Sequence, residues 1–546
     1  MPEISNLEQK ILSFLHISPS EKEAFVHPQY LLADPFLFAD MHKAVDRLQA
    51  AINTGEHITI YSDYDCDGIP GAVVLRDFFE LIGYIEKVSV YIPDRHDEGY
   101  GISGVGIDFL QKNNTTLVIT IDVGITATKE IAHLQSIGID VLLTDHHQPL
   151  GGDTPDYPGA YAVVHPKKGD YPDKNPCGAG VIFHFIRAFI TKYGADYNIS
   201  IDQTKWLLDL VGFATLADMV PLIGENRVLA WYGMLVMRKT KRLGLQTLFL
   251  KNNMSLATLT EQDLTFTLAP RLNAASRMDT PMLAFDLLST RSHAQAIALA
   301  DNLEKINNER KKLVTKISKE AHSRLDKRVL PDIVVIGDLS WRPAVLGLVA
   351  NKLQETYKRS FFVWGESGDG LIKGSCRMQD EHHAAYLFQA LSSDVLLHGG
   401  GHQAAGGFAV EKEKIHFLEN ALNEAIAVVG HVAAEKNTSV AIQVDLASVH
   451  TKTLSMVRSF APFGVGNPEP VFLFENVVIE SVKMFGKHQE HIEITISDMT
   501  GRATGFMFFA SEDIVAVLQK GAKISFTGVI VAGWKGGVRI HIKEVI

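Results

Sequence analysis

A chain of 546 residues is too long for one hydrophobic core, and at roughly 100–200 residues per domain we expect three or four domains. No apolar run reaches the ~18 residues of a membrane span, and Met1-Pro2-Glu3-Ile4-Ser5 lacks the features of a signal peptide, so we expect a soluble, cytoplasmic protein with no membrane partner. The net charge of −11 does not by itself indicate a nucleic-acid-binding protein. A local basic surface can still bind nucleic acid, and bound cations would neutralise any acidic metal ligands that contribute to this number, so we treat it as neutral evidence.

Residues 1–49 read as a helical flank, and the pattern changes after them. β-branched runs then alternate with helical stretches, which predicts a doubly wound parallel α/β sheet with right-handed crossovers. The expected strands are Ile58–Tyr61, Val88–Ile92, Leu117–Ile121, Val141–Thr144 and Ala160–Val164, and the expected helices are Gly71–Ile82, Ile102–Lys112 and Lys129–Ile137. Residues 178–290 read as mostly helical and complete a first domain over 50–290.

A long connecting helix is predicted over residues 291–328. Between Leu303 and Arg328 it holds nine Lys/Arg and four Asp/Glu, which suits a solvated connector or a surface facing nucleic acid equally well. A strand-like run after Pro331 opens a smaller α/β domain over 329–430. In residues 431–546, alternating apolar runs separated by Gly and Asp turns predict a β-barrel, and its 11 basic and 11 acidic residues make it neutral.

Three of the expected strands end on acidic residues. They precede Asp63-Tyr64-Asp65-Cys66-Asp67-Gly68, Asp122 and Asp145-His146-His147. Ligands of open α/β sheets bind beyond the carboxyl ends of parallel strands, so these three ends can converge. Alternate residues of extended chain share a face, so we expect the first motif to aim several carboxylates at one place. Carboxylates with imidazoles suit Mn²⁺, with Mg²⁺ as an alternative.

Other motifs have weaker interpretations. The first acidic motif follows a strand and has Val74 where an EF-hand needs a bidentate glutamate, which argues against calcium. Gly99-Tyr100-Gly101-Ile102-Ser103-Gly104 has dinucleotide-binding spacing but does not follow a strand directly, so a turn that presents Arg95 is the better account. His382-His383 has no preceding strand and reads as a surface pair. The three cysteines are too far apart for a metal knuckle or a disulfide framework, which fits a reducing compartment.

Several motifs together resemble the DHH phosphoesterase family. The acidic motifs resemble its first three motifs, and the fourth is Ala217-Asp218-Met219-Val220-Pro221. The linking and DHH-associated parts of the family are similar to Pro270-Arg271-Leu272-Asn273-Ala274-Ala275, Gly374-Ser375-Cys376-Arg377 and Gly399-Gly400-Gly401-His402-Gln403-Ala404-Ala405-Gly406. Pro462-Phe463-Gly464-Val465-Gly466-Asn467-Pro468 and the barrel after it resemble the OB-fold part of the family's single-strand-specific 5′→3′ DNA exonucleases.

The resemblance implies a site for two divalent ions, Mn²⁺ or Mg²⁺, that activate a water and stabilise an in-line displacement at phosphorus. The implied ligands are Asp63, Asp65, Asp67, Asp122, His146 and Asp218, with Asp63 as a ligand or its immediate support. Asp145 would orient an imidazole, and His147 would contact the phosphate or its metal-bound water. The implied catalytic set is Asp122, Asp145, His146, His147 and His402.

The same resemblance implies phosphate contacts, with Arg95 at a terminal 5′-phosphate. The implied substrate-binding residues are Arg95, Arg271, Asn273, Ser375, Arg377 and His402. Candidates for single-strand binding by the barrel are Phe485, Lys487, Phe506, Phe508, Trp534, Lys535 and Arg539, and we expect about half of these aromatic rings to pack in the core. The chain departs from the family at Ser276, Arg342, Ala344 and Met378, which puts details of substrate contact in doubt.

The leading hypothesis is a 5′→3′ exonuclease on single-stranded DNA that releases 5′-mononucleotides in repair and recombination. An alternative is a phosphodiesterase of the same family that acts on short oligonucleotides or cyclic dinucleotides, although such relatives typically lack the barrel. A second alternative is a non-catalytic DNA-binding scaffold, which the complete set of expected ligands disfavours. The resemblance further implies a single-strand-binding protein and a helicase as partners, and we expect the chain to act as a monomer.

Overall fold

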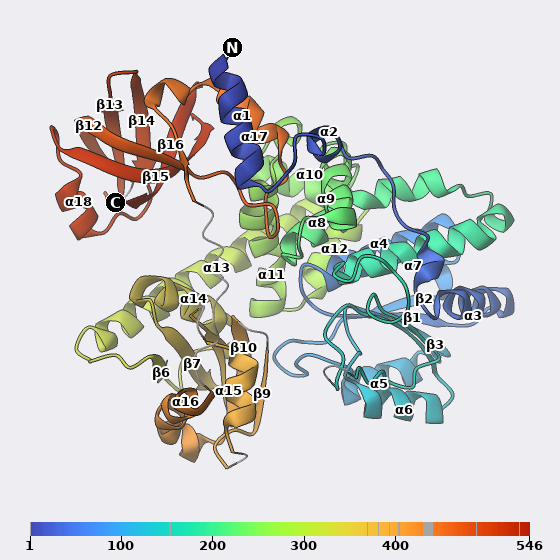
Figure 1. Cartoon of the computed structure of the whole chain (residues 1–546). Helices are drawn as coiled ribbons and strands as arrows, with labels where there is room; N and C mark the ends of the chain where they lie inside the picture. Colours follow the sequence, from blue (N-terminus) through green and yellow to red (C-terminus); the bar gives the residue numbers. More distant parts are fainter. Residues whose placement is uncertain are drawn as a thin grey trace. The chain divides into compact units, whose positions relative to one another are not determined.

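The computed structural model describes residues 2–151, 154–368, 370–379, 382–392, 394–401, 404–429, 440–486, 489–533 and 536–546 (Figure 1). The chain divides into two compact units. The larger comprises Asp34–Asp218 and Met237–Lys436, and the smaller comprises Met1–Ala33, Met219–Val236 and Asn437–Ile546. Among the described residues, no helix is both long enough and apolar enough to cross a membrane.

The first sheet of the larger unit is parallel throughout, as predicted, with the order β2-β1-β3-β4-β5. Its strands are β1 (Ile58–Ser62), β2 (Val88–Tyr91), β3 (Leu117–Ile121), β4 (Asp140–Thr144) and β5 (Ala162–Val164). The helices α5 (Gly104–Lys112) and α6 (Thr128–Ser136) cover one face, and α3 (Met41–Thr54), α4 (Gly68–Leu81) and α7 (Gly178–Tyr193) cover the other (Figure 1). Every side chain of β1 and β3 is buried, because both faces of the sheet are covered.

The strand order reverses between β1 and β3, because the chain passes from β1 to β2 on one side and then to β3 on the other. In the sheet register, Ser62 pairs with Ile121, and Ile121 pairs with Thr144. The next residues, Asp63, Asp122 and Asp145, therefore lie in one row beyond the carboxyl ends of adjacent strands. Such a reversal is where ligands bind in doubly wound folds, and the predicted convergence of the acidic strand ends is confirmed.

A mostly helical region follows, as predicted, and leads into a long helix. Its helices are α8 (Leu208–Ala217), α9 (Gly224–Met237), α10 (Leu243–Lys251), α11 (Ala269–Met278), α12 (Met282–Ser289) and α13 (His293–Leu325). The buried residues of α13 recur at three- and four-residue spacing, including Leu303, Ile306, Val314, Ile317 and Ala321. This periodicity places one face of α13 in the core and leaves its lysines exposed.

The second sheet of the larger unit is mixed, with the order β6-β7-β8-β10-β9, in which only β6 and β7 pair in parallel. Its strands are β6 (Ile333–Gly337), β7 (Ser360–Glu366), β8 (Ile372–Arg377), β9 (His398–Gly401) and β10 (Ala405–Val410). Helices α14 (Leu346–Tyr357), α15 (Ala384–Ala390) and α16 (Ile415–Val429) pack on it. His382 was expected at the surface but is 2% exposed, because its Nδ1 forms a 2.7 Å hydrogen bond with the Ser360 hydroxyl.

The smaller unit contains the predicted barrel, which the pairing of β12 with β15 closes. Its strands are β11 (Ile442–Gln443), β12 (Phe472–Phe485), β13 (His491–Ser497), β14 (Arg502–Met507), β15 (Lys523–Ala532) and β16 (Val538–Val545), with helices α17 (Thr451–Ser459) and α18 (Glu512–Val517). The helices α1 (Pro2–Phe14) and α2 (Lys22–Val26) also belong here, and Ile11 and Leu12 are buried in the barrel core.

Part of the predicted flank is therefore integral to the barrel unit. Residues 219–236, which we placed in the first domain, also belong to that unit. The reason is that an apolar helix face predicts burial without specifying the partner that buries it. The remaining predicted domain boundaries stay predictions.

Candidate active site

The first acidic motif is a turn, and the extended conformation that we expected for it is wrong. Asp65 Oδ1 accepts hydrogen bonds from the backbone N–H groups of Asp67 (2.7 Å) and Gly68 (3.1 Å), so α4 begins at Gly68 and not at the predicted Gly71. Pro70 is tolerated because its missing N–H falls in the first helical turn. A Cβ on Gly68 would lie 2.5 Å from the Asp63 carbonyl oxygen, so only glycine fits this turn. The turn, and not strand alternation, gathers the carboxylates.

Asp67 is held by the N-terminus of α7. The backbone N–H of Ala179 donates to Asp67 Oδ1 at 2.8 Å, and the N–H of Gly178 donates to Oδ2. A helix N-terminus presents unpaired N–H groups and favours negative charge. Burial and the charge of Asp65 nevertheless raise the pKa of Asp67 to about 6. The N-terminus of α7 therefore holds the Asp67 side chain in place, while burial and Asp65 disfavour its charged form.

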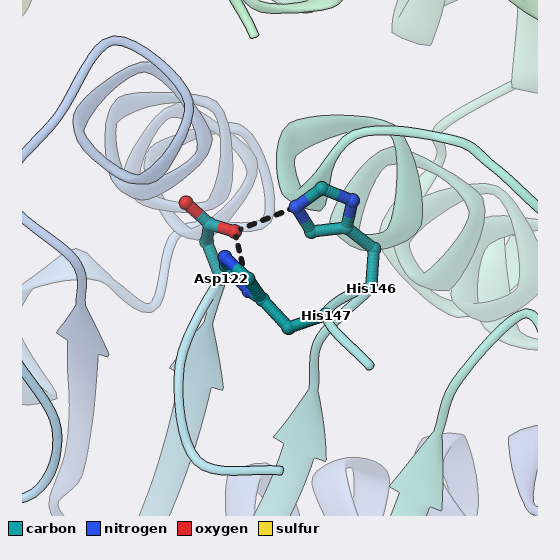
Figure 2. A group of neighbouring side chains, drawn as sticks. All are labelled: Asp122, His146 and His147. Atoms are coloured by element: carbon teal, nitrogen blue, oxygen red, sulfur yellow. Dashed lines mark ion pairs between the residues drawn. The ribbon is translucent and has the colours of Figure 1, made fainter. Parts of the chain in front are cut away.

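Asp122 follows β3 in the left-handed backbone region, with φ 61°, and its carboxylate is directed toward the two histidines (Figure 2). Its Oδ1 lies 3.1 Å from His146 Nε2 and 3.5 Å from His147 Nδ1. Within the part of the chain that the structure describes, neither Asp122 Oδ1 nor His146 Nε2 has a hydrogen-bond partner, although both are buried. Burial and the neighbouring His147 lower the pKa of His146 to about 3, so its ring is neutral, which is the form that binds metal ions.

Asp145 lies behind the two histidines at the end of β4 and is completely buried. Its Oδ1 accepts from the backbone N–H of His146 (2.8 Å) and His147 (3.1 Å) and lies 2.8 Å from His147 Nδ1, while Oδ2 accepts from Ile125 N–H (2.9 Å). Burial opposes the charge of this carboxylate, but these hydrogen bonds outweigh it and lower its pKa to about 2. This position matches the predicted orienting role, which stays a prediction.

Three overlapping groups of ligand atoms form at this edge of the sheet. In each group the atoms lie within 4.8 Å of one another, and the groups are Asp122–His146–His147, Asp67–His146–Asp218 and Asp63–Asp65–Asp122. Asp218 enters from the end of α8, with Oδ2 3.7 Å from His146 Nε2. All six predicted ligands are thus brought together.

The electrostatics of this cluster favour divalent cations. Burial and neighbouring carboxylates raise the pKa values of Asp63, Asp122 and Asp218 well above the ordinary range. Two carboxylate oxygens, Asp63 Oδ1 and Asp122 Oδ1, are buried and form no hydrogen bond with any described residue. Burying carboxylates without compensation is strongly unfavourable unless cations neutralise them. Oxygen donors with one imidazole suit Mn²⁺ and Mg²⁺.

Comparison with known proteins identifies the lineage. The models of the DHH family N-terminal domain, the DHHA1 domain and the RecJ OB domain match residues 57–215, 328–434 and 440–543. The single-stranded-DNA-specific exonuclease RecJ of Escherichia coli (strain K12) is 30% identical over 455 residues, which cover 79% of this chain and 77% of that protein. The chain belongs to the RecJ family.

Two further RecJ proteins extend this comparison. RecJ of Bacillus subtilis (strain 168) is 33% identical over 505 residues, which cover 91% of this chain but 61% of the relative. The chain thus spans about three fifths of the length of that relative. The crystal structure of RecJ from Thermus thermophilus in complex with Mn²⁺ matches with a TM-score of 0.78 at 25% identity, over 99% of this chain and 77% of that one. The predicted combination of DHH domain, DHH-associated domain and OB-fold barrel is confirmed.

The phosphate-binding residues implied by RecJ resemblance differ in their surroundings. The Arg95 guanidinium lies 4.9 Å from the ring centre of Tyr64. Arg377, at the end of β8, donates from Nη1 to its neighbour's carbonyl oxygen, Cys376 O, at 2.8 Å. Within the described ranges, neither arginine has a carboxylate partner. Both are therefore available to an anion, and Ser375 and Asn273 are half-buried.

Arg271 has a different environment from the other predicted arginines. Its Nε pairs with Glu304, Nη1 donates to Thr267 O at 2.6 Å, and Nη2 donates to the Asn252 side chain. These contacts favour a structural role at the α11–α13 contact, and its phosphate contact stays a prediction. Among the other predicted residues, His402, Lys487, Trp534 and Lys535 lie outside the described residues.

Sequence reasoning missed three residues of this site. Gly178 contributes an N–H to Asp67, and a Cβ there would lie 2.6 Å from Asp122 Cβ. The Tyr100 hydroxyl lies 3.3 Å from His147 Nδ1. Burial and the charges of other arginines, including Arg95, lower the pKa of Arg277 to about 9. The available signals were the glycine-rich start of α7, and an arginine two residues after the Pro270–Ala275 motif.

The departures from the RecJ pattern do not touch the carboxylates. Ser276 is buried in α11, and its hydroxyl donates to Asn273 O at 3.3 Å. Met378 is 3% exposed in the core under the second sheet. Ala344 offers its carbonyl oxygen to Arg277 Nη1 at 2.9 Å. These three residues act through packing and backbone contacts, and Arg342 makes side-chain contacts that are described below.

Proposed function

We propose that the chain is a metal-dependent exonuclease that degrades single-stranded DNA from its 5′ end and releases 5′-mononucleotides. The observation that carries this proposal is the cluster of six acidic and imidazole side chains at the strand-order reversal, two of whose carboxylate oxygens are buried without a hydrogen-bond partner among the described residues. Membership in the RecJ family supports the substrate and the polarity.

The side chains of the cluster would have two kinds of role, holding the metal ions and donating a hydrogen bond to the phosphate. Asp67, Asp122, His146 and Asp218 would hold one divalent ion, and Asp63, Asp65 and Asp122 would hold a second. When bound, such ions generate a nucleophile from water and stabilise the attacking and leaving oxygens of a phosphodiester. Burial opposes a charged ring at His147, but its hydrogen bond with Asp145 raises the pKa to about 9. The ring is then protonated near neutral pH and can donate to a phosphate oxygen.

Asp145→Asn tests the orienting role of this carboxylate. The amide cannot accept from His147 Nδ1 and Ile125 N–H with the same strength, so the imidazoles lose their fixed orientation. We expect kcat on single-stranded DNA to fall by about 10- to 100-fold, the range seen when groups that orient metal ligands are removed. Steady-state kinetics with Mn²⁺ measures this, and a kcat within twofold of the parent would exclude the role.

The unpaired arginines support recognition of phosphate. Burying the charge of a guanidinium that has no carboxylate partner is unfavourable unless a bound anion neutralises it. Burial lowers the pKa of Arg377, and the nearby Arg95 adds to that effect. A guanidinium can bind phosphate oxygens in pairs, and we assign Arg95 with Arg377 to the 5′-phosphate. Ser375 lies beside Arg377 on β8, and both are packed around Gly347.

The barrel carries an aromatic cluster that suits single-stranded DNA. His491 lies 5.0 Å from Phe508 and 4.7 Å from Phe509, measured between ring centres, and the Arg539 guanidinium lies 4.8 Å from the ring centre of Phe506. Phe508 and Phe509 are 40% and 78% exposed, whereas Phe506 is buried. Exposed rings on an OB-fold stack with bases without regard to sequence.

We expect the double variant Phe508→Ala, Phe509→Ala to bind long single strands about 10- to 100-fold more weakly, because base stacking contributes about 1–3 kcal/mol per base. The rate of a single turnover at saturating strand should change less than twofold, because these residues lie outside the metal cluster. Fluorescence anisotropy with a labelled strand measures the affinity. Met499→Ala, which removes a fully exposed side chain of the same barrel, is the control. Equal losses in both variants would refute the stacking role.

A comparison of three substrates separates the proposed function from its alternatives. We expect digestion of a long linear single strand to mononucleotides, no cutting of a closed circular strand, and slower use of a 5-mer. Exclusive activity on the 5-mer or on a cyclic dinucleotide would favour the phosphodiesterase alternative. Binding of the long strand without hydrolysis in Mn²⁺ would favour the scaffold.

The setting of this activity is also part of the proposal. Three buried, unpaired cysteines suit a reducing compartment, and we place the enzyme in the cytoplasm. A single-strand-binding protein and a helicase would supply its strand, and the chain would act as a monomer. Size-exclusion chromatography with light scattering tests the last point.

A further inference from the structure

Arg342 lies on a segment that is fixed firmly to the second sheet. Its neighbour Trp341 is 2% exposed and donates from Nε1 to Glu320 of α13 at 3.2 Å. The backbone of β7 approaches closely on the other side, since a Cβ on Gly365 would lie 1.9 Å from the Trp341 carbonyl oxygen. The backbone of Arg342 is thus held in place, and its side chain projects from a rigid support.

From this support the segment makes three contacts with the loop after β2 and with α11. Arg342 Nη2 lies 3.1 Å from His96 Nε2 and donates to Met278 O at 3.2 Å. In the opposite direction, Arg277 Nη1 donates to Ala344 O at 2.9 Å. Arg342 therefore joins the loop after β2 and the end of α11 to the second sheet. His96 also forms a hydrogen bond with the backbone of Arg277, so the loop and α11 contact each other directly as well.

The loop that Arg342 holds also carries Arg95. Its fold is local, because Asp94 Oδ1 accepts from His96 N–H at 2.7 Å, and Glu98 Oε1 accepts from Asp94 N–H at 2.8 Å. Arg95 projects from it toward Tyr64, which lies between two residues of the metal cluster, Asp63 and Asp65. The contacts to Arg342 thus attach this loop to the second sheet at the residue next to Arg95.

We propose that Arg342 is a positioning residue for the 5′ end of the substrate: it holds His96, and through it the Arg95 loop, so that Arg95 meets the terminal 5′-phosphate at a fixed distance from the metal cluster. This inference rests on the proposed function. It concerns Arg342, one of the positions at which the sequence departs from the family pattern.

The surroundings of the contact support it. His96 must be a neutral ring to accept from a guanidinium, and burial together with the charge of Arg342 lowers its pKa, which keeps it neutral. Both segments, Arg95–Tyr100 and Leu339–Ala344, line a cavity of about 1130 Å³ together with residues of the second sheet, including Glu366 and Lys373. That volume exceeds the ~300–1,000 Å³ of ordinary small-molecule sites and can take a terminal nucleotide.

The test compares two strands of the same sequence, one with a 5′-phosphate and one with a 5′-hydroxyl. The parent should prefer the phosphorylated strand. In Arg342→Ala we expect the KM for that strand to rise about tenfold and kcat to change less than threefold. The reason is that a misplacement of about 1 Å in a positioning group can lower the efficiency of an enzyme by up to about 100-fold. The ratio of kcat/KM for the two strands should fall about tenfold, since loss of the loop contact acts mainly on the phosphorylated end.

Two further variants separate positioning from folding. His96→Ala should give a similar loss. The double variant Arg342→Ala, His96→Ala should lose clearly less than the sum of the two single losses, because the two substitutions share the Arg342–His96 contact. Arg342→Lys should recover part of the preference. Arg359→Ala removes an exposed arginine that pairs with Asp332 in the same region, and it should match the parent.

The outcomes separate a failure of the positioning role of Arg342 from a failure of the proposed exonuclease activity. Additive losses, or an Arg342→Ala variant that keeps the full preference for the 5′-phosphate, would overturn the positioning role and leave the exonuclease intact. A parent that cuts both strands equally would overturn both the assignment of Arg95 and the role of Arg342. A parent that cuts neither strand would overturn the proposed function itself.

Discussion

Asp122→Asn is expected to reduce phosphodiester hydrolysis by at least about 1,000-fold, because metal ions supply several kcal/mol of transition-state stabilisation and every 1.4 kcal/mol is a factor of ten. Asp122 belongs to two of the three ligand groups, and its Oδ1 also lies 3.1 Å from His146 Nε2 of the remaining group. Asparagine is preferable to alanine because residue 122 has φ 61°, a conformation that asparagine tolerates.

The same substitution should raise the thermal stability of the metal-free protein. Burial and neighbouring carboxylates raise the pKa of Asp122, so its charge destabilises the fold at neutral pH when no cation is bound. In EDTA, Asp122→Asn should therefore unfold at a higher temperature than the parent, while Mn²⁺ should raise the Tm of the parent more than that of the variant.

Calorimetry in EDTA and in Mn²⁺ measures both effects. Asp108→Asn, on the exposed face of α5, is the matched control and should resemble the parent in both buffers. A variant that melts below the parent in EDTA and keeps the full response to Mn²⁺ would show that Asp122 is a structural residue. Retained hydrolysis would exclude the site altogether.

Gly178→Ala is expected to be the most damaging substitution that leaves every ligand in place. A Cβ at residue 178 would lie 2.6 Å from Asp122 Cβ and 2.9 Å from Asp122 Oδ1. Either the carboxylate or the start of α7 must shift, and α7 also donates two N–H groups to Asp67. We expect a loss of stability of about 1–3 kcal/mol from overpacking. We also expect kcat to fall by about 100-fold or more, because an error of about 1 Å in a catalytic group has that cost.

The control for this substitution is Gly104→Ala. Gly104 begins α5 as Gly178 begins α7, but a Cβ there would have no neighbour within 4 Å. This variant should therefore keep its activity and, if anything, gain stability from the loss of a glycine. Chemical denaturation and steady-state kinetics on the same preparations separate stability from catalysis. Equal kcat values for the two variants would mean that the close packing against Asp122 has no functional consequence.

The sequence predicted the site better than it predicted the packing of the chain. β-branched runs located β1, β3 and β4, and the rule for parallel sheets placed Asp63, Asp122 and Asp145 together, because strand ends are local features of the sequence. Asp218 could not be found in this way. It ends a helix about 70 residues after Asp145, and only its resemblance to a family motif drew attention to it.

The features that the sequence did not predict depend on contacts with other parts of the fold. Gly178 reads as an ordinary glycine at a helix start, and its importance comes from Asp122, which belongs to another element. Residues 219–236 read as one more helix of the first domain, because amphipathic spacing does not specify the partner. The acidic motif was expected as extended chain because strand alternation was assumed to continue past Ser62, whereas Asp65 turns the backbone by accepting from Gly68.

The most direct test of the central claim is digestion of one single strand labelled at either its 5′ or its 3′ end, in Mn²⁺ and in EDTA. We predict that the 5′ label is released at once as a mononucleotide in Mn²⁺, that the 3′ label stays in long products until late in the reaction, and that EDTA stops both. Early release of the 3′ label, cutting at internal positions, or digestion that continues in EDTA would contradict the account.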